Sequence, residues 1–148
     1  RQRQMCIRGR KLVGDSSELI CVHDAVRPFV TKELIEKAVS GCSEHDGVIV
    51  AQPSTYTIKK VMDNQILETL QREIIWRAQT PQVFSKSALQ EALKMAEEEN
   101  IQGTDEASLL ERIGYQVGFV EGSSLNIKIT TKEDWVFAEA IYNHLQHD

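Results

Sequence analysis

The sequence has no apolar run that approaches the roughly 20 residues of a membrane-spanning helix. Its three cysteines form no CxxC pair and have no spacing typical of a metal site. The net charge is −5 and the basic residues are mostly spread along the chain, which argues against a nucleic acid polymer as partner. These absences predict a cytoplasmic protein with no membrane contact.

Several signatures of catalysis are also missing. There is no Walker loop GxxxxGK[ST], no GxGxxG, no GxSxG and no HExxH, so hydrolase and zinc-enzyme interpretations lose support. No internal repeat and no linker rich in proline, glycine or serine divides the chain. Its 148 residues, 41% of them hydrophobic, are therefore expected to form one domain, 1–148.

Apolar runs and helix signals alternate along the first third of the chain. Leu19 to Val22 is typical of a short strand, and Thr31 can cap a helix that follows it. Gly47 to Ala51 is a continuous apolar run, as in strands buried on both faces. This order is a βαβ unit, and it predicts an α/β fold with a doubly wound, mostly parallel sheet.

Two helices are predicted in the next part. Ser87, with Gln90 three residues later, forms a capping box for the first. Thr104 or Asp105 starts a shorter second helix, which Gly114 can end.

Strands are then expected at 116–121 and 126–130. Thr131 and Asp134 form the capping pair of a closing helix. The apolar face of this helix is formed by residues at helical spacing, namely Trp135, Ala138, Ile141, Tyr142 and Leu145.

One segment breaks the alternation. Two extended stretches, 58–62 and 66–70, flank Asp63-Asn64, a pair suited to a tight hairpin turn. The mixed polar and apolar faces of this hairpin cannot build a core alone. We therefore expect a protruding β-arm that packs against something else, and dimerisation follows naturally.

Polar residues after apolar runs are the candidates for a functional site, because ligands of open α/β sheets bind beyond the C-terminal ends of the strands. Four clusters qualify: 23–28 (HDAVRP), 57–59 (TIK), 103–106 (GTDE) and 126–128 (NIK). They bring together acidic, basic and hydroxyl side chains, a combination suited to nucleotide chemistry.

Asp24 and Arg27 are the strongest candidates of the first cluster. The carboxylate can hold Mg²⁺ or a ribose hydroxyl, and the guanidinium can bind a phosphate from the same loop. A structural Asp–Arg pair explains the same spacing equally well. His23 has no carboxylate or serine partner nearby in the sequence, so a structural role is favoured for it.

The remaining candidates also have two interpretations. Lys128 can neutralise a phosphate, although an exposed lysine at a strand end is commoner. Thr104 at a helix N-terminus is suited to anion binding, with plain N-capping favoured. Arg72 and Thr80 are either phosphate contacts or ordinary surface and turn residues.

Five motifs taken in order are more specific than any one of them. These motifs are HDAVRP, TIKK, AQTPQVF, GTDEAS and EGSSLNIKITTKEDW. Through them the chain, from about Arg1 to Tyr142, closely resembles the 2-C-methyl-D-erythritol 4-phosphate cytidylyltransferase family. The resemblance implies a fold of the nucleotide-diphospho-sugar transferase type. It also implies a homodimer in which the arm, Pro53 to Ile74, completes the active site of the other subunit.

The resemblance assigns roles to single residues. Asp24 would support the nucleotide and Mg²⁺, and Arg27 and Lys128 would lie beside the reacting phosphates. Thr80 and Thr104 would line the methylerythritol phosphate pocket.

From the arm, Thr57 and Arg72 would reach the substrate of the partner subunit. The implied reaction is attack by a phosphate oxygen of methylerythritol phosphate on the α-phosphorus of CTP. The products would be CDP-methylerythritol, an intermediate of the non-mevalonate isoprenoid pathway, and pyrophosphate.

The chain departs from the family pattern in two places. Tyr56-Thr57 stands where the family has an Asp-Thr pair. The Gly-rich loop that grips the CTP triphosphate is not in this sequence, which begins at Arg1 without an initiator Met; Arg1 and Arg3 would follow the base-binding glycines. We therefore expect the C-terminal two-thirds of a longer enzyme, inactive alone.

Two alternatives compete with this interpretation. A ribitol 5-phosphate cytidylyltransferase has the same fold and a similar HDxVRP loop, and the GTDEAS stretch favours methylerythritol phosphate over it. An inactive dimerisation fragment, with the sheet and arm but no bound nucleotide, is the other.

Overall fold

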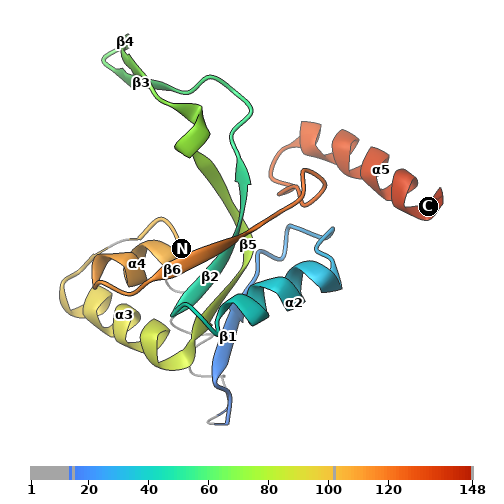
Figure 1. The fold of residues 1–148 in the computed structure, drawn as a ribbon. Helices are drawn as coiled ribbons and strands as arrows, with labels where there is room; N and C mark the ends of the chain where they lie inside the picture. Colours follow the sequence, from blue (N-terminus) through green and yellow to red (C-terminus); the bar gives the residue numbers. More distant parts are fainter. Residues whose placement is uncertain (1–13, 15, 102, 148) are drawn as a thin grey trace.

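The computed structural model describes residues 14, 16–101 and 103–147, so the expectation for Arg1 and Arg3 lies outside the described residues. Within the described part, helices lie on both faces of a central sheet, which confirms the predicted α/β fold (Figure 1). The sheet has four strands, in the order β1 (Leu19–Val22), β5 (Trp76–Ser85), β2 (Gly47–Pro53) and β6 (Val117–Glu121).

Three strands of this sheet run in one direction. β2 and β6 are parallel, and β5 is antiparallel to both β1 and β2. The described sheet is therefore mixed, with β5 running against the other three. This reversed strand lies between β1 and β2, where its two edges are both paired.

Helices α2 (Lys32–Gly41), α3 (Lys86–Glu98) and α4 (Glu106–Arg112) cover the sheet, α2 on one face and α3 with α4 on the other (Figure 1). Val83 of β5 packs in the apolar cluster under α2, and its neighbour Phe84 packs in the cluster under α3 and α4. Neither side chain has exposed surface. Successive side chains of a strand point to opposite faces, so β5 is fixed from both sides.

One helix start differs from the prediction. Helix α3 begins at Lys86, and its N-cap is Ser85 rather than Ser87. Ser85 Oγ accepts a hydrogen bond from Ala88 N at 3.3 Å, and Ser85 N donates to Asp46 O at 2.8 Å. β5 thus runs into α3 without a loop, and the helix starts two residues earlier than the capping box predicted.

The strand predicted at 126–130 is wrong. Ile129 N donates to Val26 O at 2.9 Å, but the segment pairs with no strand of the described sheet. The amide of Thr131 donates to Asp134 Oδ2 at 2.8 Å, and Asp134 N donates back to Thr131 Oγ1 at 3.3 Å. This reciprocal pair starts α5 (Lys132–His147), as predicted. Asp134 Oδ2 also accepts from Thr130 N at 2.8 Å, an amide that a strand ladder would use.

The predicted apolar face of α5 is mostly exposed. Ala138 is buried, whereas Trp135, Tyr142 and Leu145 are between 47% and 60% exposed. The periodicity predicted the helix correctly but not its packing. No helix in the described part of the chain is both long enough and apolar enough to span a membrane.

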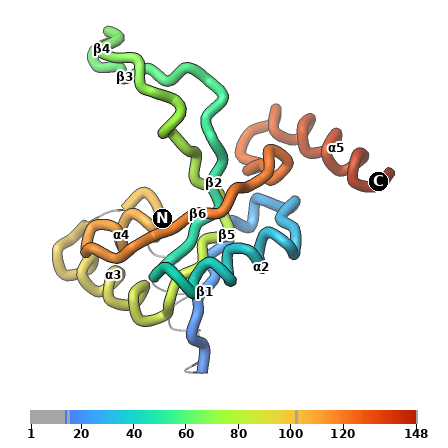
Figure 2. Tube along the Cα trace, viewed as in Figure 1, coloured from blue at the N-terminus to red at the C-terminus, as the bar shows by residue number. Residues whose placement is uncertain are grey.

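The hairpin protrudes from the body of the protein (Figure 2). It consists of β3 (Lys59–Met62) and β4 (Gln65–Thr69), and a 3-10 turn, η1 (Arg72–Ile74), leads back to β5. Asp63 and Asn64 have φ angles of 49° and 62°, the left-handed conformation that a tight hairpin turn needs. The predicted turn is confirmed, and every residue of both strands is exposed.

Candidate active site

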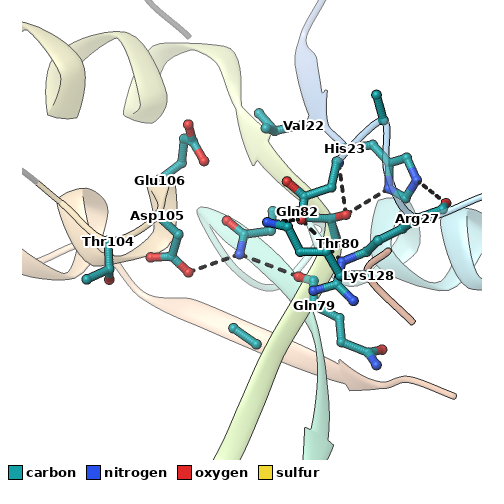
Figure 3. A pocket seen from close by; sticks show the side chains of 13 residues that line it. Val22, His23, Arg27, Gln79, Thr80, Gln82, Thr104, Asp105, Glu106 and Lys128 are labelled. Atoms are coloured by element: carbon teal, nitrogen blue, oxygen red, sulfur yellow. Dashed lines mark hydrogen bonds and ion pairs between the residues drawn. The ribbon is translucent and has the colours of Figure 1, made fainter. Parts of the chain in front are cut away.

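A cavity of about 400 Å³ opens at the end of β1. Its walls come from the loop after β1, the middle of β5, the start of α4 and the segment that holds Lys128 (Figure 3). Five of the seven residues predicted for the site line it: Asp24, Arg27, Thr80, Thr104 and Lys128.

Asp24 is the charge centre of this cavity. Its Oδ2 accepts from Lys128 Nζ at 3.0 Å and from Arg27 Nε at 3.2 Å. Burial raises the pKa of Asp24, but the hydrogen bonds and charges of Lys128 and Arg27 outweigh burial and hold that pKa below its ordinary value. The carboxylate is therefore ionised at neutral pH.

Arg27 and Lys128 differ in how they are held. The Arg27 side chain is 11% exposed, and its Nη1 also donates to Asn126 O at 2.9 Å. The structural Asp–Arg pair considered from the sequence is thus present, and it ties the loop to the 126–128 segment. The Lys128 side chain is 39% exposed, so its ammonium is the more accessible of the two cations.

Thr80 lies where β5 leaves the regular ladder. Ile49 of β2 pairs with Gln82, but the next residue, Val50, pairs with Gln79. Thr80 and Pro81 therefore form a bulge, a feature that re-aims side chains next to active sites. Thr80 Oγ1 accepts from Asp24 N at 3.0 Å, which joins the bulge to the loop after β1.

The opposite wall is formed at the start of α4. Asp105, one of the two predicted caps, accepts from Ser108 N at 3.0 Å through Oδ1. Its Oδ2 accepts from Gln82 Nε2 at 3.0 Å, and the Gln82 amide lies between Asp105 and the Gln79 backbone (Figure 3). Thr104 lines the cavity beside this cap without being the cap itself.

Sequence reasoning missed Gln79 and Gln82 and gave Asn126 no role. Asn126 is fully buried, and its Nδ2 donates to Thr80 O at 2.8 Å. The sequence holds a partial signal, because three polar residues stand at 79, 80 and 82, directly before the apolar pair Val83-Phe84. Polar groups in such a position need partners, and a site is one way to provide them.

Comparison with known proteins identifies the chain. The family model "IspD: 2-C-methyl-D-erythritol 4-phosphate cytidylyltransferase" matches residues 1–144. The chain belongs to this family. A relative of that name from Syntrophus aciditrophicus is 44% identical over 142 residues, which are 95% of this chain and 61% of the relative. Another from Bacillus velezensis is 46% identical over 134 residues, which are 90% of this chain and 57% of the relative.

Solved structures of the family share the fold. The crystal structure of 4-diphosphocytidyl-2C-methyl-D-erythritol synthase from Anaerococcus prevotii matches with a TM-score of 0.91 and 32% identity, over 97% of this chain and 64% of that one. The enzyme from Thermus thermophilus matches with a TM-score of 0.86 and 29% identity, over 95% and 68%. This IspD-family chain covers 61% of the length of the Syntrophus aciditrophicus relative and 57% of the length of the Bacillus velezensis relative.

The two remaining predicted residues of this IspD-family chain lie on the arm. Thr57 and Arg72 are exposed, and Arg72 Nε contacts Glu73 Oε1 at 3.5 Å. Neither residue lines the cavity described above. The structure therefore divides the predicted set into five residues at the cavity and two on the arm.

The donors for a metal ion are few. In the described part of this IspD-family chain, no group of three or more His, Cys, Asp or Glu side chains could hold a metal ion. Asp24 is the acidic side chain beside the two cations, and its Oδ2 already accepts from both. Such a single carboxylate fits Mg²⁺ only where substrate phosphates and water complete the octahedron.

Proposed function

We propose that the complete protein transfers CMP from CTP to 2-C-methyl-D-erythritol 4-phosphate and releases pyrophosphate, a step of isoprenoid biosynthesis in the cytoplasm. The observation that supports this most is the Asp24–Arg27–Lys128 cluster on the cavity of an IspD-family chain. Two cations on one carboxylate leave a net positive charge on this cluster, which suits phosphates, whereas Asp105 and Glu106 lie at the start of α4 on the opposite wall.

In this proposal the residues of the chain align the reactants and neutralise charge. Lys128 is held by Asp24 at 3.0 Å before any substrate arrives, so its ammonium needs little reorganisation. Arg27 is fixed by two partners and adds positive charge behind it. Thr80 and Thr104 line the side of the cavity where the polyol phosphate would bind. Phosphoryl transfer is accelerated mainly by such positioning and neutralisation.

Mg²⁺ belongs to the proposal as a companion of the CTP phosphates. When bound it would neutralise phosphate oxygens, and Asp24 would supply its one protein ligand from this chain. Loss of Mg²⁺ activation in Asp24→Asn, beyond the loss seen in Lys128→Ala, is the expected result. Equal Mg²⁺ dependence in both variants would remove Asp24 as the ligand.

The arm supports a homodimer. Its strands expose four large apolar side chains, Val61, Met62, Ile66 and Leu67, each at least half exposed. Such a surface is a candidate protein interface. We place Thr57 and Arg72 of this arm at the substrate of the partner subunit. Sedimentation should show a dimer that Ile66→Lys weakens, whereas the exposed-helix control Lys94→Glu leaves it intact.

The family relationship does not favour the ribitol 5-phosphate alternative, because the matched family and the curated relatives carry the methylerythritol name. The test offers both polyol phosphates, with CTP, to the protein made from its complete reading frame. Pyrophosphate release with methylerythritol phosphate, and little with ribitol 5-phosphate, is expected. The opposite preference would replace the proposed substrate, and no release with either would leave the inactive-fragment alternative.

A further inference from the structure

Three residues that line the cavity and the buried Asn126 form a closed ring of hydrogen bonds. His23 Nδ1 lies 2.9 Å from Thr80 Oγ1, and His23 Nε2 lies 3.0 Å from Arg27 O (Figure 3). Arg27 Nη1 donates to Asn126 O at 2.9 Å, and Asn126 Nδ2 donates to Thr80 O at 2.8 Å. The ring thus connects the loop after β1, the bulge of β5 and the segment that leads to Lys128.

The Arg27 carbonyl fixes the direction of one bond of His23. A backbone carbonyl only accepts, so Nε2 carries the hydrogen and donates to Arg27 O. In a neutral imidazole Nδ1 then accepts, and the Thr80 hydroxyl is its donor. The same hydroxyl oxygen accepts from Asp24 N at 3.0 Å. Both imidazole nitrogens are therefore occupied, and these two contacts hold the ring in one orientation.

The ring supplies hydrogen bonds to two segments that the strand ladder does not pair. The ladder between β2 and β5 skips Thr80 and Pro81, so β2 does not hold the bulge. The 126–128 segment pairs with no strand in the described sheet. Side-chain bonds of the ring join these two pieces to the Arg27 loop, together with the bonds from Ile129 N to Val26 O and from Asp24 N to Thr80 Oγ1.

From this geometry we propose that His23 is a positioning residue that sets the places of Arg27 and Thr80 for the reaction. Its Nε2 holds the backbone of Arg27, and its Nδ1 holds the hydroxyl of Thr80. One lone pair remains on Thr80 Oγ1, so Thr80 can only accept from a ligand. It therefore contacts a hydroxyl of the polyol and not an ionised phosphate oxygen. The kinetic part of this inference rests on the proposed function.

Two conservative variants separate the two contacts of His23. In His23→Asn, Oδ1 can replace Nδ1 as acceptor for Thr80, but the donor to Arg27 is lost. In His23→Gln, Nε2 can replace the donor to Arg27, but the acceptor for Thr80 is lost. We expect kcat to fall roughly tenfold in His23→Asn with KM for the polyol phosphate kept. We expect His23→Gln to keep kcat and raise that KM roughly tenfold.

The experiment uses the protein from its complete reading frame, with His147→Gln as the matched control at an exposed position. A residue with only a structural role would lower the amount of folded enzyme, and thus kcat, in both variants alike. Parallel losses in the two variants, or no loss in either, would overturn the proposal. The split between kcat and KM supports it.

A nitrogen NMR spectrum of the imidazole tests the ring without any turnover. Hydrogen on Nε2 of His23 is expected, together with an Arg27 Nε–H signal that persists in His23→Gln and broadens in His23→Asn. Hydrogen on Nδ1, or an Arg27 signal indifferent to both changes, would overturn the ring. If the wild-type protein fails to turn over while these spectra hold, the proposed function fails and the ring stands.

Discussion

Replacing Arg27 with lysine keeps the charge at the cavity but removes the fork of the guanidinium. Arg27 donates through Nε to Asp24 and through Nη1 to Asn126 O, at 3.2 and 2.9 Å. A lysine ammonium is a point donor on a flexible stem and cannot span both partners. The Arg27 side chain is 11% exposed and Asn126 is fully buried. Little water therefore reaches the carbonyl of Asn126 to replace the lost donor.

The magnitude follows from the bond that is lost. A hydrogen bond from a charged group contributes about 1.5–3 kcal/mol, so Arg27→Lys should lower the free energy of unfolding by about 2 kcal/mol. Urea unfolding followed by tryptophan fluorescence measures this change. The matched control is Arg112→Lys, because Arg112 is exposed and its contact to Glu99 is 3.9 Å long. If Arg27→Lys lowers the free energy of unfolding no more than Arg112→Lys does, the bond from Arg27 to Asn126 O does not stabilise the fold.

Three further predictions use other parts of the fold. Burial raises the pKa of Asp24, but the hydrogen bonds and charges of Lys128 and Arg27 lower it, and the net shift is downward. The stability from its ion pairs is therefore present above the unfolded pKa of about 3.9 and is lost as pH falls through the folded pKa. Asp24→Asn should flatten this acid dependence in urea titrations at several pH values, and an unchanged slope would contradict it. Ser85→Ala should lower the melting temperature by the loss of about 1 kcal/mol of capping, whereas Ser87→Ala should not; a larger loss in Ser87→Ala would make Ser87 the cap. A Cβ at Gly47 would meet Phe84 Cδ1 at 2.4 Å, so Gly47→Ala should cost about 1–3 kcal/mol in urea unfolding, and a neutral result would show that the ring shifts easily.

Local signals in the sequence predicted local structure well. The turn at Asp63-Asn64 and the capping pair of α5 each depend on residues within a few positions of one another. The cap of α3 was misplaced because β5 continues to Ser85, where it pairs with Leu19 of β1 and where Ser85 N donates to Asp46 O. A capping motif read alone cannot show how long the preceding strand is.

The site was predicted only in part, because the sequence shows local signals but not contacts between distant positions. Charged residues after apolar runs pointed to Asp24 and Lys128, which the structure brings to 3.0 Å. The 126–130 segment was predicted as a strand because its composition suits one, but its amides bond to the loop after β1 and to the α5 cap. The ring through His23 and Asn126 joins positions far apart in the chain, and no spacing in the sequence indicates it.

We propose that Lys128, held by Asp24, acts on the reacting phosphates of CTP and methylerythritol phosphate. The most direct test is kcat/KM for pyrophosphate release by the complete protein, compared with Lys128→Ala and with Lys94→Ala. Lys94 is an exposed helix lysine whose Nζ lies 3.8 Å from Glu98 Oε1, so its loss controls for a change of charge. We predict a fall of about 100-fold or more in Lys128→Ala and none in Lys94→Ala. Equal kcat/KM values in the two variants would contradict this role of Lys128.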